Sequence, residues 1–278
     1  MALNVPVSLE FFPPRTLAGI ENLAAERQKL YALRPEFCSV TFGAGGSTQQ
    51  GTLSTVRAIV KEGVKGVPHL SCIGQSKDDI RRHLKEFREA GVRRIVALRG
   101  DWPSGYGPSE GDSDFYYARD LVRFIRDETG EYFHIDVAAY PEMHPQARTP
   151  WADLDAFASK AAAGANSAIT QYFFNADAYF RLVDELRRRG VDIPVVPGIM
   201  PISNAPQLLR FSDACGAEVP RWLRLRLEAY GDDVESVRAL GCEFMAGLCR
   251  RLIAGGAPAL HIYTLNRSAP TLALCQNV

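Results

Sequence analysis

Short apolar runs alternate along the chain with longer segments in which apolar residues recur every three or four positions. The runs predict strands at residues 7–12, 37–42, 67–73, 94–99, 135–140, 168–174, 193–199 and 259–264. Thr16 can cap a first helix, whose apolar positions are Ile20, Leu23, Leu30 and Leu33. The spacing predicts further helices at residues 53–60, 78–90, 116–126, 151–163, 178–189, 207–215, 221–229 and 234–254, and a short one after the last strand.

The predicted strands are apolar almost throughout, which is typical of parallel strands covered on both faces. Eight strand–helix units of this kind predict an α/β fold, a single (βα)8 TIM barrel over residues 1–278. A doubly wound open sheet is the competing fold. The barrel is favoured because no G-x-G-x-x-G motif follows the first strand and no linker divides the chain.

Composition narrows the functional classes. Lys+Arg and Asp+Glu both total 32, so no basic surplus favours nucleic acid or an anionic membrane as a partner. The six cysteines include no C-x-x-C pair, so no metal site is expected. We see no signal peptide and no apolar run of membrane length, and we therefore expect a cytoplasmic protein.

In a (βα)8 barrel the chemistry lies at the carboxyl ends of the strands. None of these ends carries a lysine, which disfavours a Schiff-base aldolase. Without an H-x-H spacing, a divalent metal held by carboxylates and His144 is also disfavoured. The amides, tyrosine, arginines and aromatic residues at the strand ends better suit a large planar ligand that accepts and donates hydrogen bonds. The ends carry Glu10, Thr41, Arg99, Gly100, Asp101, Tyr140, Glu142, His144, Gln171, Asn266 and Arg267, and His69 lies within the third strand.

Glu10 stands out because its neighbours Leu9, Phe11 and Phe12 are apolar. Burying a carboxylate is costly, and burial raises its pKa, so Glu10 is a candidate general acid. Pairing with an arginine is the structural alternative.

Other features also have ordinary explanations. Asp101 can cap a turn, residues 43–47 can be a flexible turn, His69 can be a core histidine, and residues 172–174 can be core packing. Gln171 is harder to explain in this way, because an amide within a strand needs partners. The Gly- and Pro-rich loop at residues 102–114 is long enough to predict a functional or mobile segment.

Seven segments together resemble methylenetetrahydrofolate reductase, in the same order and over essentially the whole chain. They are LEFFPPR at 9–15, SVTFGA at 39–44, PHLSC at 68–72, ALRGD at 97–101, AAYPEMHP at 138–145, ITQYFF at 169–174 and YTLNR at 263–267.

The resemblance implies a barrel that binds FAD and reduces 5,10-methylenetetrahydrofolate to 5-methyltetrahydrofolate with NADH or NADPH, by a ping-pong mechanism. It assigns Glu10 as the acid that opens the folate ring and Asp101 as a residue that helps bind folate and tune the flavin. It places substrate contacts at Gln171, Gln207, Phe211 and Arg267. It places FAD contacts at Thr41, His69, Arg99, Gly100, Asp101, Tyr117, Ala118, Tyr140, His144, Ala147, Asp153 and Lys160.

The resemblance also implies a homo-oligomer that acts in one-carbon metabolism and methionine supply. The chain stops soon after the last strand, so we expect no C-terminal regulatory domain. Two alternatives stay open: another flavin- or metal-using barrel enzyme, and a barrel that binds flavin or folate without turnover.

Overall fold

A computed structural model describes residues 4–42, 46–101 and 113–278. The strands are β1 (Val7–Phe11), β2 (Cys38–Val40), β3 (Gly66–Ser71), β4 (Arg94–Leu98), β5 (His134–Ala139), β6 (Ser167–Thr170), β7 (Val195–Val196), β8 (Gly198–Ile199) and β9 (Leu260–Tyr263). The α-helices are α1 (Leu17–Leu30), α2 (Gly46–Lys61), α3 (Lys77–Glu89), α4 (Ala118–Thr129), α5 (Pro150–Ala162), α6 (Ala176–Arg188), α7 (Ala205–Cys215), α8 (Arg221–Tyr230), α9 (Val234–Ala254) and α10 (Ser268–Gln276). A single 3-10 turn, η1 (Tyr31–Leu33), follows α1.

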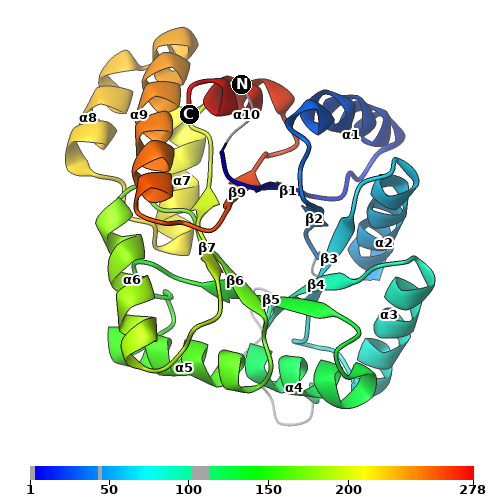
Figure 1. Ribbon diagram of the computed structural model, residues 1–278. Coiled ribbons are helices and arrows are strands. Elements are labelled where there is room, and N and C mark those ends of the chain that lie inside the picture. Colours follow the sequence, from blue (N-terminus) through cyan, green and yellow to red (C-terminus); the bar gives the residue numbers. More distant parts are fainter. Residues whose placement is uncertain (1–3, 43–45, 102–112) are drawn as a thin grey trace.

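The strands form one parallel sheet that curls into a barrel, with the helices in a ring outside it (Figure 1). The spatial order is β7-β6-β5-β4-β3-β2-β1-β9-β8. The first strand pairs with the last, because Ser8 lies opposite His261 and Glu10 opposite Tyr263. The predicted TIM barrel is therefore confirmed.

The seventh predicted strand, residues 193–199, is wrong as a single element. β7 pairs with β6 and β8 pairs with β9, and Pro197 lies between them. Proline has no N–H to donate to a ladder, so the strand breaks there. At Gly198 a Cβ would lie 2.1 Å from Thr170 O, and the Gly198 N–H donates to Thr170 Oγ1 at 2.9 Å. The two halves together complete the ring in which eight strands were expected.

Most helix boundaries lie within three residues of the predicted ones, but α2 begins seven residues before the predicted start at residue 53. Thr16 Oγ1 accepts a hydrogen bond from Gly19 N at 3.1 Å, as expected of a cap. Gly91, Gly164 and Gly190 follow helix ends with positive φ. The predicted turn at residues 43–47 is wrong at Gly46, where α2 already begins, and 43–45 lie outside the described residues. Most of the predicted loop at 102–114 also lies outside them.

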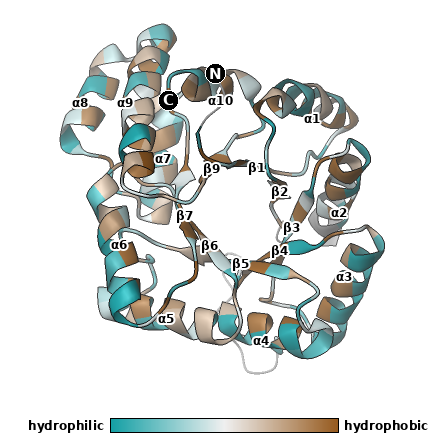
Figure 2. Cartoon of the chain, viewed as in Figure 1, coloured by the Kyte–Doolittle hydropathy of each residue, from teal (hydrophilic) through white to brown (hydrophobic). Residues whose placement is uncertain are grey.

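Two apolar cores flank the sheet. The larger one lies between the strands and the helices, whose apolar sides face inward (Figure 2). A smaller one, made by Phe37, Val67, Val96 and Ile169, is separate from it. Successive residues of a strand point to opposite faces, so one set packs on helices and the other fills the barrel.

An ion pair lies beside this smaller core. Asp136 of β5 is fully buried and accepts hydrogen bonds from Arg94 Nε at 2.6 Å and Nη2 at 2.9 Å. Ser167 Oγ donates to the same carboxylate at 2.5 Å. Burial opposes the charge, but hydrogen bonds from His134, Arg94 and Ser167 and the charge of Arg94 hold the pKa of Asp136 well below its usual range. A buried ion pair thus joins β4 and β5 on the side of the barrel away from the carboxyl ends of the strands.

None of the helices within the described ranges is both long and apolar enough to pass through a lipid bilayer.

Candidate active site

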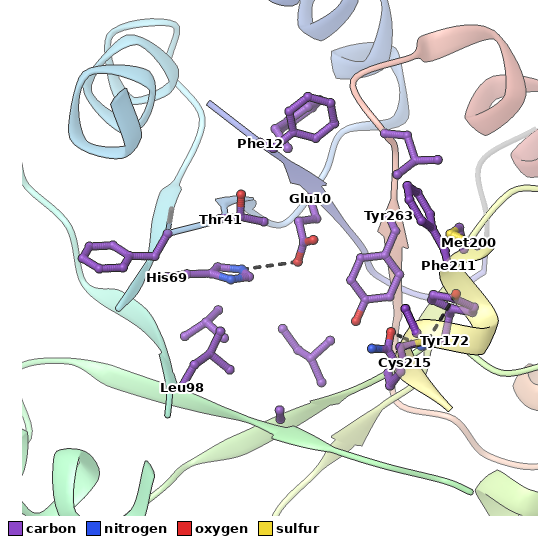
Figure 3. A pocket seen from close by; sticks show the side chains of 18 of the residues that line it. Glu10, Phe12, Thr41, His69, Leu98, Tyr172, Met200, Phe211, Cys215 and Tyr263 are labelled. Atoms are coloured by element: carbon purple, nitrogen blue, oxygen red, sulfur yellow. Dashed lines mark hydrogen bonds and ion pairs between the residues drawn. The ribbon is translucent and has the colours of Figure 1, made fainter. Parts of the chain in front are cut away.

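A cavity of about 500 Å³ opens at the carboxyl ends of the strands. Its size suits a small-molecule ligand, and its walls are mostly apolar and aromatic with a few polar groups. Figure 3 shows Glu10 and His69 on one side and Tyr172, Phe211, Cys215 and Tyr263 on the other. Of the residues predicted for the site, the lining includes Glu10, Thr41, His69, Tyr140, Gln171 and Phe211.

Glu10 lies between two imidazoles. Its Oε2 is 3.3 Å from His69 Nε2 and 3.4 Å from His261 Nε2. His261 is fully buried, and its Nδ1 lies 2.7 Å from Ser8 Oγ. The carboxylate therefore ends a buried chain that runs from Ser8 through His261 to Glu10, and no arginine of the described residues pairs with it.

The expected rise in the pKa of Glu10 is wrong. Burial does raise the pKa, but the charge of His69 and hydrogen bonds from both imidazoles outweigh it and lower the pKa to about 2. The prediction was wrong because it considered only the residues next to Glu10 along the chain, and not those next to its carboxylate in space. Leu9 and Phe11 belong to the core against the helices, whereas Glu10 alternates with them and points toward the imidazoles.

Sequence reasoning did not single out Ser8, His261 or Tyr263. A signal was present, because Ser8 and Glu10 are two residues apart on the first strand, as are His261 and Tyr263 on the last. In a closed barrel these two strands are neighbours, so the four side chains had to meet inside.

The opposite wall joins β6, β9 and α7. Gln171 follows β6, is half-buried, and accepts a hydrogen bond from Tyr172 N at 3.0 Å through its own Oε1. The Tyr263 hydroxyl donates to Thr170 O at 2.7 Å, and Cys215 Sγ donates to the Tyr172 hydroxyl at 3.3 Å. The side-chain amide nitrogen of Gln171 has no partner among the described residues, so it is free to donate to a ligand.

The remaining predicted residues lie around the rim formed by the ends of β4 and β5. Arg99 donates to Gln146 Oε1 at 2.6 Å, and Gly100 has a φ of 84°, which favours glycine. His144 stacks edge-on with Tyr140, their ring centroids 4.5 Å apart. Asp101 and Tyr117 are exposed, Ala118 begins α4, and Ala147 N donates to His144 O. Asp153 Oδ2 accepts from His144 N at 2.9 Å.

Lys160 on α5 is unusual within this rim. Its Nζ donates to Ala138 O at 2.5 Å, yet no carboxylate oxygen in the part of the chain that the structure describes lies within 4 Å of it. Burial lowers the pKa of Lys160 to about 8, although the charge of Asp153 opposes that change. The ammonium group thus lacks a close counter-ion.

Comparison with known proteins decides the family. The model of the methylenetetrahydrofolate reductase family matches residues 2–278. The chain belongs to the methylenetetrahydrofolate reductase family.

Relatives in this family span bacteria and plants. The chain is 38% identical to 5,10-methylenetetrahydrofolate reductase of Salmonella typhimurium over 276 residues, which cover 99% of this chain and 91% of that protein. The enzyme of Escherichia coli is equally similar, with the same shares covered. Methylenetetrahydrofolate reductase (NADH) 1 of Arabidopsis thaliana is 37% identical, but the match covers only 48% of that longer protein.

Solved structures confirm the fold. An uncharacterized protein from Clostridium thermocellum, whose structure binds two copies of 5-methyl-5,6,7,8-tetrahydrofolic acid, superposes with a TM-score of 0.69. The match covers 98% of this chain and 93% of that one, at 14% identity. Because the identity is low, this likeness shows the architecture alone.

Three residues that the family resemblance assigned to substrate are not in the cavity lining: Asp101, Gln207 and Arg267. Gln207 is half-buried on α7, one turn before Phe211. Arg267 is exposed at the start of α10 and lines a neighbouring cavity instead. Among the described residues there is no group of three or more His, Cys, Asp or Glu side chains placed to hold a metal ion.

Proposed function

We propose that this protein reduces 5,10-methylenetetrahydrofolate to 5-methyltetrahydrofolate, with electrons from NADH or NADPH and FAD as cofactor. The observation that carries the proposal is the position of Glu10. In a member of this family, a carboxylate lies inside an apolar cavity that also presents a free amide at Gln171 and the aromatic rings of Phe211 and Tyr263. Such a cavity suits a flat, nitrogen-rich ring system.

Glu10 acts on the folate as a general acid. It delivers a proton to a nitrogen of the five-membered ring, which lets the carbon–nitrogen bond break and leaves an electrophilic methylene iminium. Gln171 hydrogen-bonds the pterin edge, and Phe211 packs against its face. Gln207 lies one turn before Phe211 on α7 and contacts a part of the folate outside the cavity lining. Asp101, at the end of β4, helps to hold the folate near the flavin.

The low pKa of Glu10 means that the carboxylate is ionised at neutral pH in the unliganded protein. A proton must therefore reach it when substrate binds. His69 and His261 both present Nε2 to the same oxygen, so a proton on either ring is one short transfer away. Substrate that fills the cavity excludes water, and this further desolvation favours the neutral carboxyl over the charged one.

The residues around β4 and β5 fit FAD. The N-terminus of α4, at Ala118, can bind an anionic group through its backbone N–H donors, and Lys160 lacks a close counter-ion. We assign both to the diphosphate, and Thr41, His69 and Tyr140 to the flavin ring beside the cavity. When bound, FAD would accept hydride from the nicotinamide and give it to the folate carbon.

Lys160→Met should weaken FAD binding by at least about tenfold, since a hydrogen bond to a charged group contributes roughly 1.5–3 kcal/mol. Quenching of flavin fluorescence on titration with apoprotein measures the dissociation constant. Riboflavin has no diphosphate, so its affinity should not change.

Lys61→Met is the matched control, because Lys61 lies in the last turn of α2, away from this rim. An equal loss of affinity for FAD and riboflavin would contradict a diphosphate contact.

Reoxidation of the reduced flavin by 5,10-methylenetetrahydrofolate tests the proposed function. Under anaerobic conditions we expect flavin absorbance to return and 5-methyltetrahydrofolate to form. Failure of the folate to reoxidise the flavin would favour a barrel that binds without turnover. Reduction by NADH and by NADPH, measured in the same apparatus, identifies the electron donor.

A further inference from the structure

Glu142 lies near the end of a barrel strand, yet the chemistry described so far gives it no role. It follows β5, in the loop that leads to α5, and its side chain is half-buried. Its Oε2 accepts a hydrogen bond from the backbone N–H of Glu218 at 2.9 Å. Glu218 lies 76 positions further along the chain, in the segment between α7 and α8. The contact therefore joins the loop after β5 to the segment after α7.

A second contact brings the same two segments together. Gly216 follows α7 with a φ of 76°, and a Cβ at this position would lie 3.2 Å from Pro145 Cγ. Between Glu142 and Pro145, Met143 has a φ of 108°, which residues other than glycine rarely adopt. Backbone strain of this kind persists only where the surrounding contacts hold it. The loop after β5 is thus held against the C-terminal end of α7.

Glu142 can accept its hydrogen bond in either protonation state. Burial raises the pKa of Glu142 to about 7, and the charge of Glu218 acts in the same direction, whereas the hydrogen bond from Glu218 N and the charge of Arg181 oppose the rise. A neutral carboxyl and a carboxylate both have an oxygen that accepts from an amide N–H. A glutamine at this position would have one as well.

The two joined segments carry residues assigned to different ligands. The loop after β5 contains His144, which stacks edge-on with Tyr140 and which the family resemblance places at FAD. Phe211 and Cys215 of α7 line the cavity (Figure 3), and Phe211 is assigned to the folate. Hydride transfer requires the flavin and the folate carbon in close and oriented contact, so the placement of α7 relative to this loop matters.

We infer that Glu142 is a positioning residue, which holds the C-terminal end of α7 against the loop after β5 and so keeps Phe211 in place before the folate binds. The inference rests on the proposed function. Without the contact, α7 can move away from the loop, and only a fraction of the unliganded protein is ready for the folate. The apparent affinity falls by that fraction. In the bound state the folate itself holds Phe211, so Glu142 acts on KM and not on kcat.

Glu142→Ala should raise the KM for 5,10-methylenetetrahydrofolate in the holoenzyme roughly three- to tenfold and leave kcat within about twofold, as expected for the loss of one hydrogen bond. Glu142→Gln should restore the wild-type KM, because its amide oxygen accepts from Glu218 N. The dissociation constant of FAD should not change, since Asp153 still accepts from His144 N. Glu228→Ala, an exposed glutamate on α8, is the matched control and should alter none of these values.

Amide hydrogen exchange tests the contact itself in the holoenzyme without folate. Mass spectrometry of peptides that span residues 216–222 should show the Glu218 amide exchanging roughly tenfold faster in Glu142→Ala than in wild type, with Glu142→Gln close to wild type. Unchanged exchange or an unchanged KM in Glu142→Ala would overturn the inference, as would equal impairment of the Ala and Gln variants. A wild-type enzyme that does not reduce the folate would refute the proposed function, and the exchange result alone would then decide whether Glu142 holds α7.

Discussion

Glu10→Gln should slow the reduction of 5,10-methylenetetrahydrofolate by about 10²- to 10⁴-fold, the usual contribution of a general acid. Oxidation of NADH or NADPH by the flavin should stay within about twofold of wild type, because no proton transfer from Glu10 enters that step. Glutamine keeps the size of the side chain and an oxygen that the imidazoles can contact, but it has no proton to deliver.

Anaerobic stopped-flow absorbance measures the two half-reactions separately. Glu21→Gln, an exposed glutamate on α1, is the matched control and should affect neither. A comparable loss in both half-reactions would mean that Glu10 supports the flavin site instead of activating the folate.

Asp136→Asn should lower the free energy of unfolding by about 3–5 kcal/mol, the cost of removing one partner from a buried ion pair. The asparagine would leave the Arg94 guanidinium without the carboxylate that accepts two of its hydrogen bonds. Asparagine keeps one acceptor oxygen, but its NH2 group replaces the other and cannot accept from Arg94. Urea denaturation, followed by far-UV circular dichroism, measures the change.

Asp127→Asn, an exposed aspartate on α4, is the control and should change stability by less than about 0.5 kcal/mol.

The pH dependence of the free energy of unfolding provides an independent check. Because folding lowers the pKa of Asp136, its contribution is complete above the unfolded pKa of about 3.9 and is lost as the pH falls toward the folded value. A wild-type protein and an Asp136→Asn variant with equal stability at pH 7 would refute the role of this pair.

Much of the fold followed from the sequence because its signals are local. Runs of apolar residues, Thr16 as a cap and glycines such as Gly91 need only a few neighbouring positions to be recognised. The position of Glu10 at the end of the barrel where the cavity opens followed in turn, since it lies near the end of a strand. The break at Pro197 could also have been read, because proline cannot donate to a ladder.

The surroundings of Glu10 could not be read from its own segment. Its partners are His69 and His261, which come from β3 and β9, and the sign of its pKa shift depends on them. The burial of Glu10 was predicted correctly, but the imidazoles from these distant strands lower its pKa by more than burial raises it.

The pairing of β1 with β9 has a consequence for synthesis of the chain. Ser8 and His261 are joined across 253 positions, and Glu10 meets its second imidazole only through that contact. Closing so long a loop is slow, since chain entropy is lost before the contact stabilises anything. On the ribosome, the first strand must wait for the last one to emerge, so a nascent chain has an unpaired β1 edge and no Ser8–His261–Glu10 contacts until translation has passed residue 263.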